Sequence, residues 1–183
     1  KFVKQADEVW HAGDIGNLEV TDTIKKIKPL RAVFGNIDDA EARSEFPLDT
    51  KFEIEKISVW MTHIGGYPNR YHQRIREDLK RNPPKIFIAG HSHILKVQYD
   101  KKLNLLHLNP GAAGNYGFHK IRTMLRFSLD NGEIKNMEII ELSGYTLEEK
   151  VSIGSKYLLP KQIKEHGLTN NDIKIGRSIL KKL

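Results

Sequence analysis

The chain has 183 residues, of which 29% are charged and 39% hydrophobic, which is typical of a soluble globular protein of one domain, with or without an appendage. It contains no cysteine. This excludes a disulfide framework, a thiolate zinc site and a cysteine nucleophile, so any metal site must use His, Asp, Asn or Glu. With no signal peptide and no apolar run of about 18 residues, we expect a cytoplasmic protein with no membrane partner.

The formal net charge of +7 favours anionic partners without identifying one. The basic residues are spread over the whole chain, with no arginine-rich stripe and no recognisable nucleic-acid motif. We therefore expect no specific nucleic-acid partner. The chain does not begin with Met, and residues 1–4 look like the end of a helix, so we expect a fragment of a longer protein.

The first elements predict a parallel α/β unit. Residues 8–13 form a short apolar run that ends in Gly-Asp, as a buried strand does. Residues 18–28 carry apolar side chains at helical spacing, and Pro29 ends that helix. Residues 30–34 read as the next strand, so the order is strand, helix, strand.

The middle of the chain predicts further strands and one helix. Residues 51–54 and 58–62 read as a hairpin, residues 70–81 as a polar helix, and residues 86–89 as a buried strand. After these, turn signals separate four short strands, which we interpret as an antiparallel meander. They span residues 95–99, 103–108, 123–129 and 135–142.

The composition changes after Glu141. Thr146 and Glu149 form a capping box, which predicts a helix that ends near Gly167. Residues 172–183 read as part of another helix. The apolar face of the first of these helices, with Leu147, Val151 and Leu158, needs a partner surface. We expect this helix to pack on the preceding domain, to associate with a second copy of the chain in a homo-oligomer, or to remain mobile.

Polar residues able to bind a metal follow four of the predicted strands. They are Asp14, Asn36, His63, His91 and His93. In an α/β sheet, ligands gather at the carboxyl ends of the strands. Alone, the Gly-Asp and Gly-Asn pairs read as turns and His63 as a hydrogen-bonded core histidine. Two imidazoles at i and i+2 after an apolar strand are harder to explain by packing. One carboxylate, one amide oxygen and three imidazoles suit Mn, Fe, Zn or Ni better than Ca or Mg.

The amino-acid sequences of these motifs are similar to those of a known family. The motifs are His11-Ala-Gly-Asp14, Gly35-Asn-Ile-Asp38, Thr62-His-Ile-Gly-Gly66, Gly90-His-Ser-His93 and Asn109-Pro-Gly111. Together they resemble the calcineurin-like metallophosphoesterases, in particular the small bacterial and archaeal phosphodiesterases, over residues 1–142.

The resemblance implies a four-layer α/β/β/α sandwich that holds two divalent metals, with Mn favoured over Ni, Zn or Fe. It implies that Asp14 bridges the metals, that Asn36, His63 and His91 complete the ligands of the second metal, and that His93 binds the first. Asn36 is also a candidate catalytic residue, because its side chain could lie near the phosphate. It further implies that a metal-bridging hydroxide attacks the phosphorus of a small phosphoester, most often a phosphodiester, in line.

Two departures from the family pattern affect this reading. Many members carry a His directly after Gly-Asn as the proton donor, but Ile37 stands here. Asp38 is then a candidate general acid, or else a turn or N-cap residue of the next helix. The family's D-x-H motif and its first strand would lie before Lys1. We therefore expect residues 1–183 alone to fold poorly and to be feebly active, and an inactive scaffold or interaction module is the alternative.

The end of the chain resembles a different protein. Residues 137–150 and 158–168 resemble the ATPase module of Lon protease. The phosphate-binding loop, the Walker acidic residues and the Ser-Lys dyad are absent, so the resemblance implies neither ATPase nor protease activity. We expect a domain boundary that separates a phosphoesterase domain, 1–142, from a Lon-like helical segment, 143–183. The alternative is an ordinary helical extension.

Four further histidines receive structural interpretations. His11 is expected in the core or behind the metal ligands, and His72 on a helix face. His107 and His119 are expected near the loops of the meander. His119 could approach the site from the loop after Asn109-Pro-Gly111, but a surface position is favoured.

Overall fold

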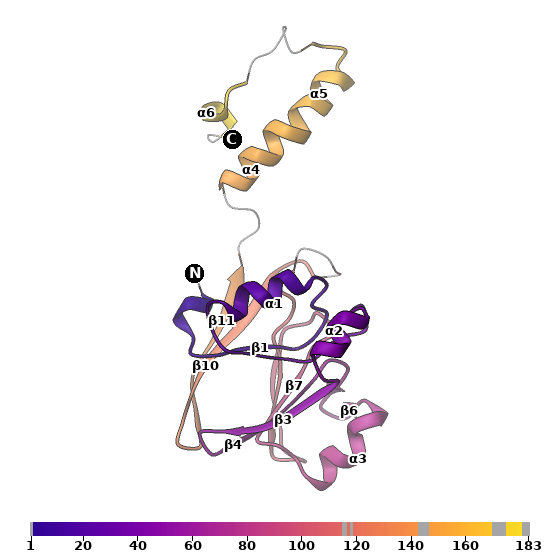
Figure 1. Cartoon of the computed structure of the whole chain (residues 1–183), viewed down its shortest axis with the longest axis vertical. Helices are drawn as coiled ribbons and strands as arrows, with labels where there is room; N and C mark the ends of the chain where they lie inside the picture. The colour runs from indigo at the N-terminus through magenta and orange to yellow at the C-terminus, as the bar shows by residue number, and fades with distance from the viewer. Residues whose placement is uncertain (1, 115–116, 118, 143–146, 170–174, 181–183) are drawn as a thin grey trace. The chain divides into compact units, whose positions relative to one another are not determined.

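The computed structural model describes residues 2–114, 117, 119–142, 147–169 and 175–180. The chain divides into two compact units, Lys1–Leu142 and Ser143–Leu183, which are shown in Figure 1. Each unit is considered by itself. No helix in the described ranges has the length and apolar character needed to cross a membrane.

The centre of the first unit is a five-stranded sheet. Its order is β3 (Asp49–Ile54), β4 (Ile57–Thr62), β7 (Ile86–Ala89), β9 (Leu105–Asn109) and β8 (Lys96–Asp100). Strands β4, β7 and β9 are parallel, whereas β3 and β8 are antiparallel edge strands. Every residue of β7 is buried, as expected for a strand covered on both faces.

A second layer of strands packs on one face of this sheet. Strand β1 (Val9–His11) pairs in parallel with β2 (Leu30–Ala32), and β10 (Arg122–Asp130) forms a hairpin with β11 (Glu133–Leu142). Because side chains alternate along a strand, one face of the five-stranded sheet supplies Val59, Met61 and Ile88. These pack against Trp10 and Phe127 of the second layer.

The predicted meander is wrong at one step. Strand β9 pairs with β7 and β8, whereas β10 pairs with β11. Pro110 has no N–H to continue a ladder, and Gly111 adopts a φ of 78°. The chain therefore leaves the five-stranded sheet after Asn109, and β10 places its apolar side chains on the core between the layers.

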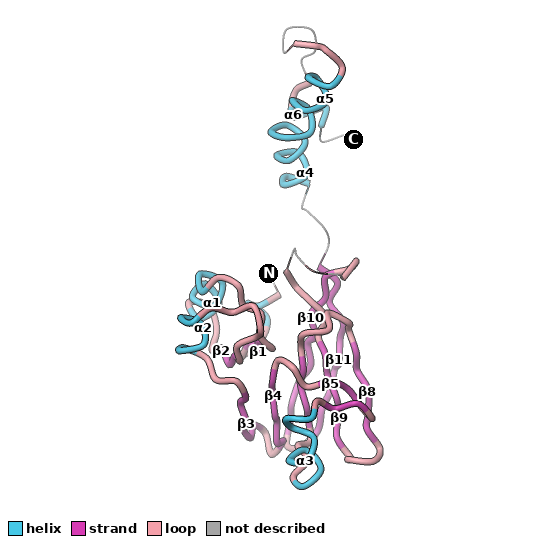
Figure 2. Tube along the Cα trace, turned by 90° about the vertical axis from the view of Figure 1, so that its right-hand side faces the viewer, coloured by secondary structure: helices cyan, strands magenta, loops and turns pink. Residues whose placement is uncertain are grey.

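Helices cover both outer faces. Helix α1 (Leu18–Lys25) and helix α2 (Ala40–Glu45) lie together over β1 and β2 (Figure 2), where Ile15, Ala32 and Phe46 form a small core. Helix α3 (Gln73–Arg81) buries Ile75 and Leu79 against the far face of the five-stranded sheet. The layers are therefore α/β/β/α, as the resemblance implies.

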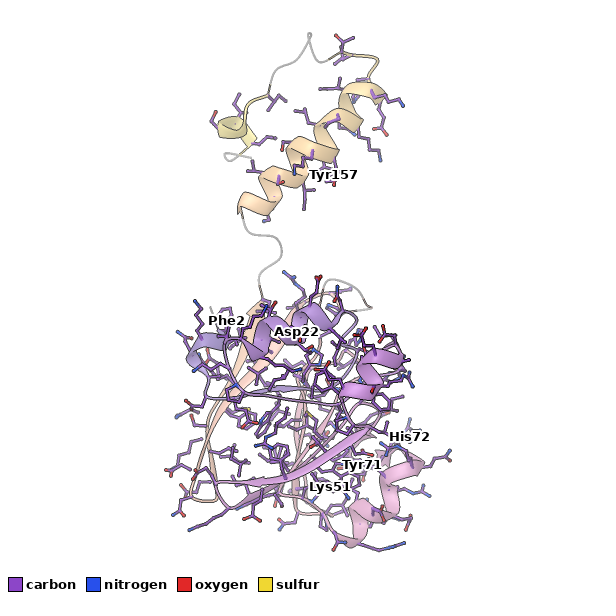
Figure 3. The ribbon with its side chains drawn as sticks, viewed as in Figure 1. Phe2, Asp22, Lys51, Tyr71, His72 and Tyr157 are labelled. Carbon is purple, nitrogen blue, oxygen red and sulfur yellow. The ribbon has the colours of Figure 1, made fainter. Side chains whose placement is uncertain are left out.

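The helix predicted over residues 70–81 begins later than expected. Arg70–Tyr71 forms strand β6, which pairs with β5 (Gly66–Tyr67). His72 then caps α3, because its Nδ1 accepts from the backbone N–H of Arg74 at 3.3 Å. His72 therefore stands at the helix start and not on its face (Figure 3).

The chain's first residues and its second unit are helical. A 3₁₀ turn spans Val3–Gln5. In the second unit, α4 (Leu147–Ile153) and α5 (Leu159–Glu165) are joined by a π-helical turn, η2 (Gly154–Leu158), and α6 spans Arg177–Leu180. The predicted stop at Gly167 is confirmed, because Gly167 has a φ of 67° and the N–H of Leu168 bonds to the Ile163 carbonyl at 2.9 Å. The predicted cap at Thr146 lies outside the described residues.

Candidate metal centre

Asp14 and Asn36 are brought together by the two parallel strands β1 and β2. Each residue follows its strand, so both side chains reach the same edge of the second layer. The approach is close, because a Cβ on Gly35 would lie 2.1 Å from Asp14 Oδ1 and 2.2 Å from its backbone nitrogen. Only glycine allows the Asn36 loop to sit against Asp14 in this way.

Two histidines converge on the same point from the five-stranded sheet. His63 follows β4 and His91 follows β7. The side-chain oxygen Oδ1 of Asn36 lies 3.0 Å from His63 Nε2 and 2.8 Å from His91 Nδ1. Asp14 Oδ1 lies 3.1 Å from His63 Nε2. One atom from each of Asp14, His63 and His91 lies within 4.8 Å of the other two.

The tautomer of His63 follows from its backbone contact. Its Nδ1 lies 2.7 Å from the carbonyl oxygen of Ala12, which can only accept, so Nδ1 carries the hydrogen. Burial lowers the pKa of His63, which keeps the ring neutral. The lone pair of Nε2 therefore points at the oxygens of Asn36 and Asp14. Such a convergence of lone pairs fits a bound cation.

Three residues of this group hold an unusual backbone conformation. Asp14, His91 and His93 have φ values of 57°, 65° and 56°. The left-handed region costs a non-glycine residue on the order of 1 kcal/mol or more, and such residues cluster at functional sites. Here it turns side chains at strand ends toward one point. His93 Nε2 lies 4.0 Å from Asp14 Oδ2, whereas His63 lies beside the other carboxylate oxygen, Oδ1.

The carboxylate of Asp38 accepts from backbone N–H groups next to this group. Asp38 is 4% exposed, and its carboxylate accepts from the N–H of Gly16 at 2.8 Å and of Gly35 at 2.7 Å. Burial alone would raise its pKa, but these backbone hydrogen bonds outweigh burial and hold the pKa below its ordinary value. A carboxyl group that stays ionised is a poor proton donor at neutral pH, so this geometry does not support the general-acid role.

The alternative N-cap role belongs to the next residue. Asp39 caps α2 by accepting from the N–H of Ala42 at 2.9 Å. Asp38 instead ties the loop after β1 to the loop after β2, because Gly16 and Gly35 belong to different loops. It thereby fixes the positions of Asp14 and Asn36 relative to each other.

An Asp38→Asn variant should lose about 1.5–3 kcal/mol of stability at neutral pH, because the amide presents N–H groups to a backbone N–H. A carboxyl group whose pKa falls on folding stabilises the protein above its unfolded pKa of about 3.9, and this contribution is lost as the pH falls through the folded pKa. Urea unfolding at several pH values should therefore show the difference between wild type and variant shrinking below about pH 4.

The matched control is Asp39→Asn, since asparagine caps a helix as well as aspartate does. We expect it to change stability by no more than a few tenths of a kcal/mol. A loss in Asp38→Asn that stayed constant down to strong acid would contradict the role assigned to this carboxylate.

One residue near the site was not predicted from the sequence, and another was predicted only as the less favoured alternative. Arg43 donates from Nε to the Asp38 carbonyl at 2.7 Å and from Nη2 to the Asn36 carbonyl at 3.0 Å, so it holds the Asn36 loop from outside. No sequence signal marks this arginine. The ring of His119 lies 5.3 Å from that of His93, centroid to centroid, so the predicted alternative, an approach to the site, is the one that the structure supports.

The other two histidines lie in strands. His11 is in β1, and burial lowers its pKa. His107 is 1% exposed within β9 and does not lie near a loop, and its Nε2 lies 3.0 Å from the Gly66 carbonyl oxygen. It packs against Tyr71 and Phe87 on the far face of the sheet.

Comparison with known proteins identifies the family. The model of the calcineurin-like phosphoesterase superfamily domain matches residues 1–132. The chain belongs to this superfamily.

Solved structures agree with a metallophosphoesterase fold. An archaeal phosphodiesterase has a TM-score of 0.57 at 21% identity, covering 75% of this chain and 84% of that one. Vps29 from Entamoeba histolytica, complexed with Zn²⁺, has a TM-score of 0.55 at 16% identity, covering 74% and 82%. At these identities the likeness shows the fold.

Part of this calcineurin-like chain also resembles Lon protease. Lon from Flavobacterium johnsoniae is 53% identical over 139 residues, which cover 67% of this chain and 17% of that protein. Lon from Porphyromonas gingivalis is 45% identical over 56 residues, 31% of this chain and 7% of that protein. The predicted partial resemblance is confirmed. The longer matches cover more of the chain than residues 137–150 and 158–168, on which the prediction rests. The chain spans about 17% of the length of the first such relatives.

Proposed function

We propose that the protein is a metal-dependent phosphoesterase, and more specifically a phosphodiesterase. The observation that carries this proposal is the convergence of Asp14 Oδ1, Asn36 Oδ1 and the lone pair of His63 Nε2 at distances of 3.0 and 3.1 Å. Membership of the calcineurin-like superfamily supports it. The similarity of the fold to an archaeal phosphodiesterase favours a diester substrate.

The donor set suits a transition metal. We propose that Asn36, His63 and His91 hold one divalent ion, that His93 holds a second, and that Asp14 contributes to both. Mixed nitrogen and oxygen ligands suit Mn, Fe, Zn or Ni, and we propose Mn as the favoured metal. When bound, such ions activate water and neutralise charge on a phosphoester.

The chain's own residues prepare this site. The Ala12 carbonyl orients His63 so that Nε2 is the free nitrogen. Asp38 and Arg43 hold the loops that present Asp14 and Asn36. Because these groups are fixed before any ligand arrives, little ordering of the protein opposes binding.

The experiment is hydrolysis of bis(p-nitrophenyl) phosphate and of p-nitrophenyl phosphate by the full-length protein, with Mn²⁺ or with EDTA. We expect turnover with Mn²⁺, none with EDTA, and at least a roughly tenfold higher kcat/KM for the diester, which is a difference of about 1.4 kcal/mol. Mn²⁺ binding without turnover of either ester would overturn the proposal in favour of an inactive scaffold.

For the second unit we propose a Lon-like helical segment, residues 143–183. The partial matches to Lon support this assignment. A continuous α4–η2–α5 helix closed by Gly167 agrees with the helical character expected of it. We propose no ATPase or protease activity for this unit.

A further inference from the structure

Two buried nitrogens near the metal centre lack an assigned role. Nδ1 of His93 and Nδ1 of His119 are inaccessible to water, and neither has a hydrogen-bond partner among the residues that the structure describes. Burying a polar atom without a partner costs on the order of 1–3 kcal/mol. Two such atoms in neighbouring rings therefore indicate a shared function.

Gly117 shows that the two nitrogens face the same place. A Cβ added to Gly117 would lie 2.3 Å from His93 Nδ1 and 2.9 Å from His119 Nδ1. The two rings meet edge to face at 72°, with their centroids 5.3 Å apart. A side chain at position 117 would thus clash with both rings, and glycine avoids this clash.

The position of the ring hydrogen of His119 follows from the contact that its Nε2 makes. His119 Nε2 lies 3.0 Å from the carbonyl oxygen of Gly114, which can only accept, so Nε2 of His119 carries the hydrogen. In the neutral ring, Nδ1 of His119 is then an acceptor. That acceptor lies on the Nδ1 side of His93, whereas His93 Nε2 faces Asp14 at 4.0 Å.

We propose that His119 is a positioning residue for His93. It accepts a hydrogen bond from Nδ1–H of His93 when the two rings close on each other, a bond that the described residues do not form in this structure, and so leaves the lone pair of His93 on Nε2, facing Asp14. Free imidazole has two tautomers, and a metal ligand needs the one whose lone pair points at the metal. This inference rests on the proposed function, because it gives Nε2 of His93 the role of a ligand.

The test uses two substitutions at one position in the full-length protein. His119→Gln keeps a side-chain oxygen that can accept from Nδ1–H, whereas His119→Leu cannot accept. Nitrogen-15 NMR of the metal-free protein reads the tautomer of His93. We expect Nδ1–H in the wild type and in His119→Gln, and a shift toward Nε2–H in His119→Leu.

Metal affinity provides a second measurement. Mn²⁺ titration should show about 10- to 100-fold weaker binding in His119→Leu, the usual effect of losing a residue that orients a ligand. His119→Gln should stay within about threefold of wild type, a difference below about 1 kcal/mol. His166→Leu, at an exposed position in the second unit, is the control and should change neither quantity.

The outcomes separate this inference from the proposed function. If the wild type binds no Mn²⁺, the proposed function fails, but the tautomer of His93 still decides the inference. An unchanged tautomer in His119→Leu would overturn the inference, whatever the activity. If His119→Leu does not fold, Gly117→Ala takes its place, because its Cβ would push the rings apart. Gly114→Ala is then the control, because an added Cβ there meets nothing within 4 Å.

Discussion

An Asp14→Asn variant of the full-length protein should lose at least about 1,000-fold in Mn²⁺-dependent phosphodiester hydrolysis. The asparagine keeps the shape of Asp14 but removes one negative charge. At an effective dielectric constant of about 20, a unit charge about 4 Å from another contributes roughly 4 kcal/mol, which corresponds to about three orders of magnitude. The loss should appear in Mn²⁺ affinity as well as in kcat/KM.

Asp22→Asn provides the matched control for this variant. Asp22 lies on α1 (Figure 3), its side chain is 57% exposed, and its ion pair with Lys25 spans 4.0 Å. Exposed pairs of this kind contribute little, so the control should keep full activity. Hydrolysis by Asp14→Asn within a few-fold of wild type would contradict the role given to this carboxylate.

A Phe87→Ala variant should lose about 3–5 kcal/mol of stability, the range measured for fully buried aromatic residues. Phe87 is inaccessible to solvent at the centre of the five-stranded sheet. Its ring contacts Trp60 and Tyr71 edge to face, with centroids 5.8 and 5.7 Å apart. Urea unfolding followed by tryptophan fluorescence reports on this unit, because Trp10 and Trp60 both belong to it.

Ile94→Ala is the control for this measurement, since Ile94 is 64% exposed and should change stability by less than about 0.5 kcal/mol. A loss below about 1 kcal/mol in Phe87→Ala would mean that the far face of the sheet is not the packed core described above.

Local patterns predicted most of the strands of the first unit. The apolar run Ile86–Ala89 and the apolar residues 59–61 are properties of single strands, so they can be recognised in the sequence without knowledge of the fold. The pairing of β10 could not be predicted in this way. Strand β10 forms a hairpin with β11 in either arrangement, and only the packing of its Phe127 against Trp10 shows which layer holds it.

The sequence predicted the residue types of the candidate site. It did not predict most of the contacts that hold these residues in place. Asp14, Asn36 and His63 follow strands, and strand ends converge in an α/β fold. The part played by Asp38 depends on two backbone N–H groups from different loops, which no spacing rule describes. His119 reaches His93 because Gly117 leaves room between them, and that contact requires the path of the loop after Gly111.

The most direct test of the account is where Mn²⁺ binds. A crystal of the full-length protein soaked in Mn²⁺ should show anomalous density in contact with Asp14, Asn36, His63 and His91, and a titration should show micromolar or tighter binding, about −8 kcal/mol. Density confined to other residues, or no binding at about 1 mM Mn²⁺, would contradict the assignment of this group as a metal centre.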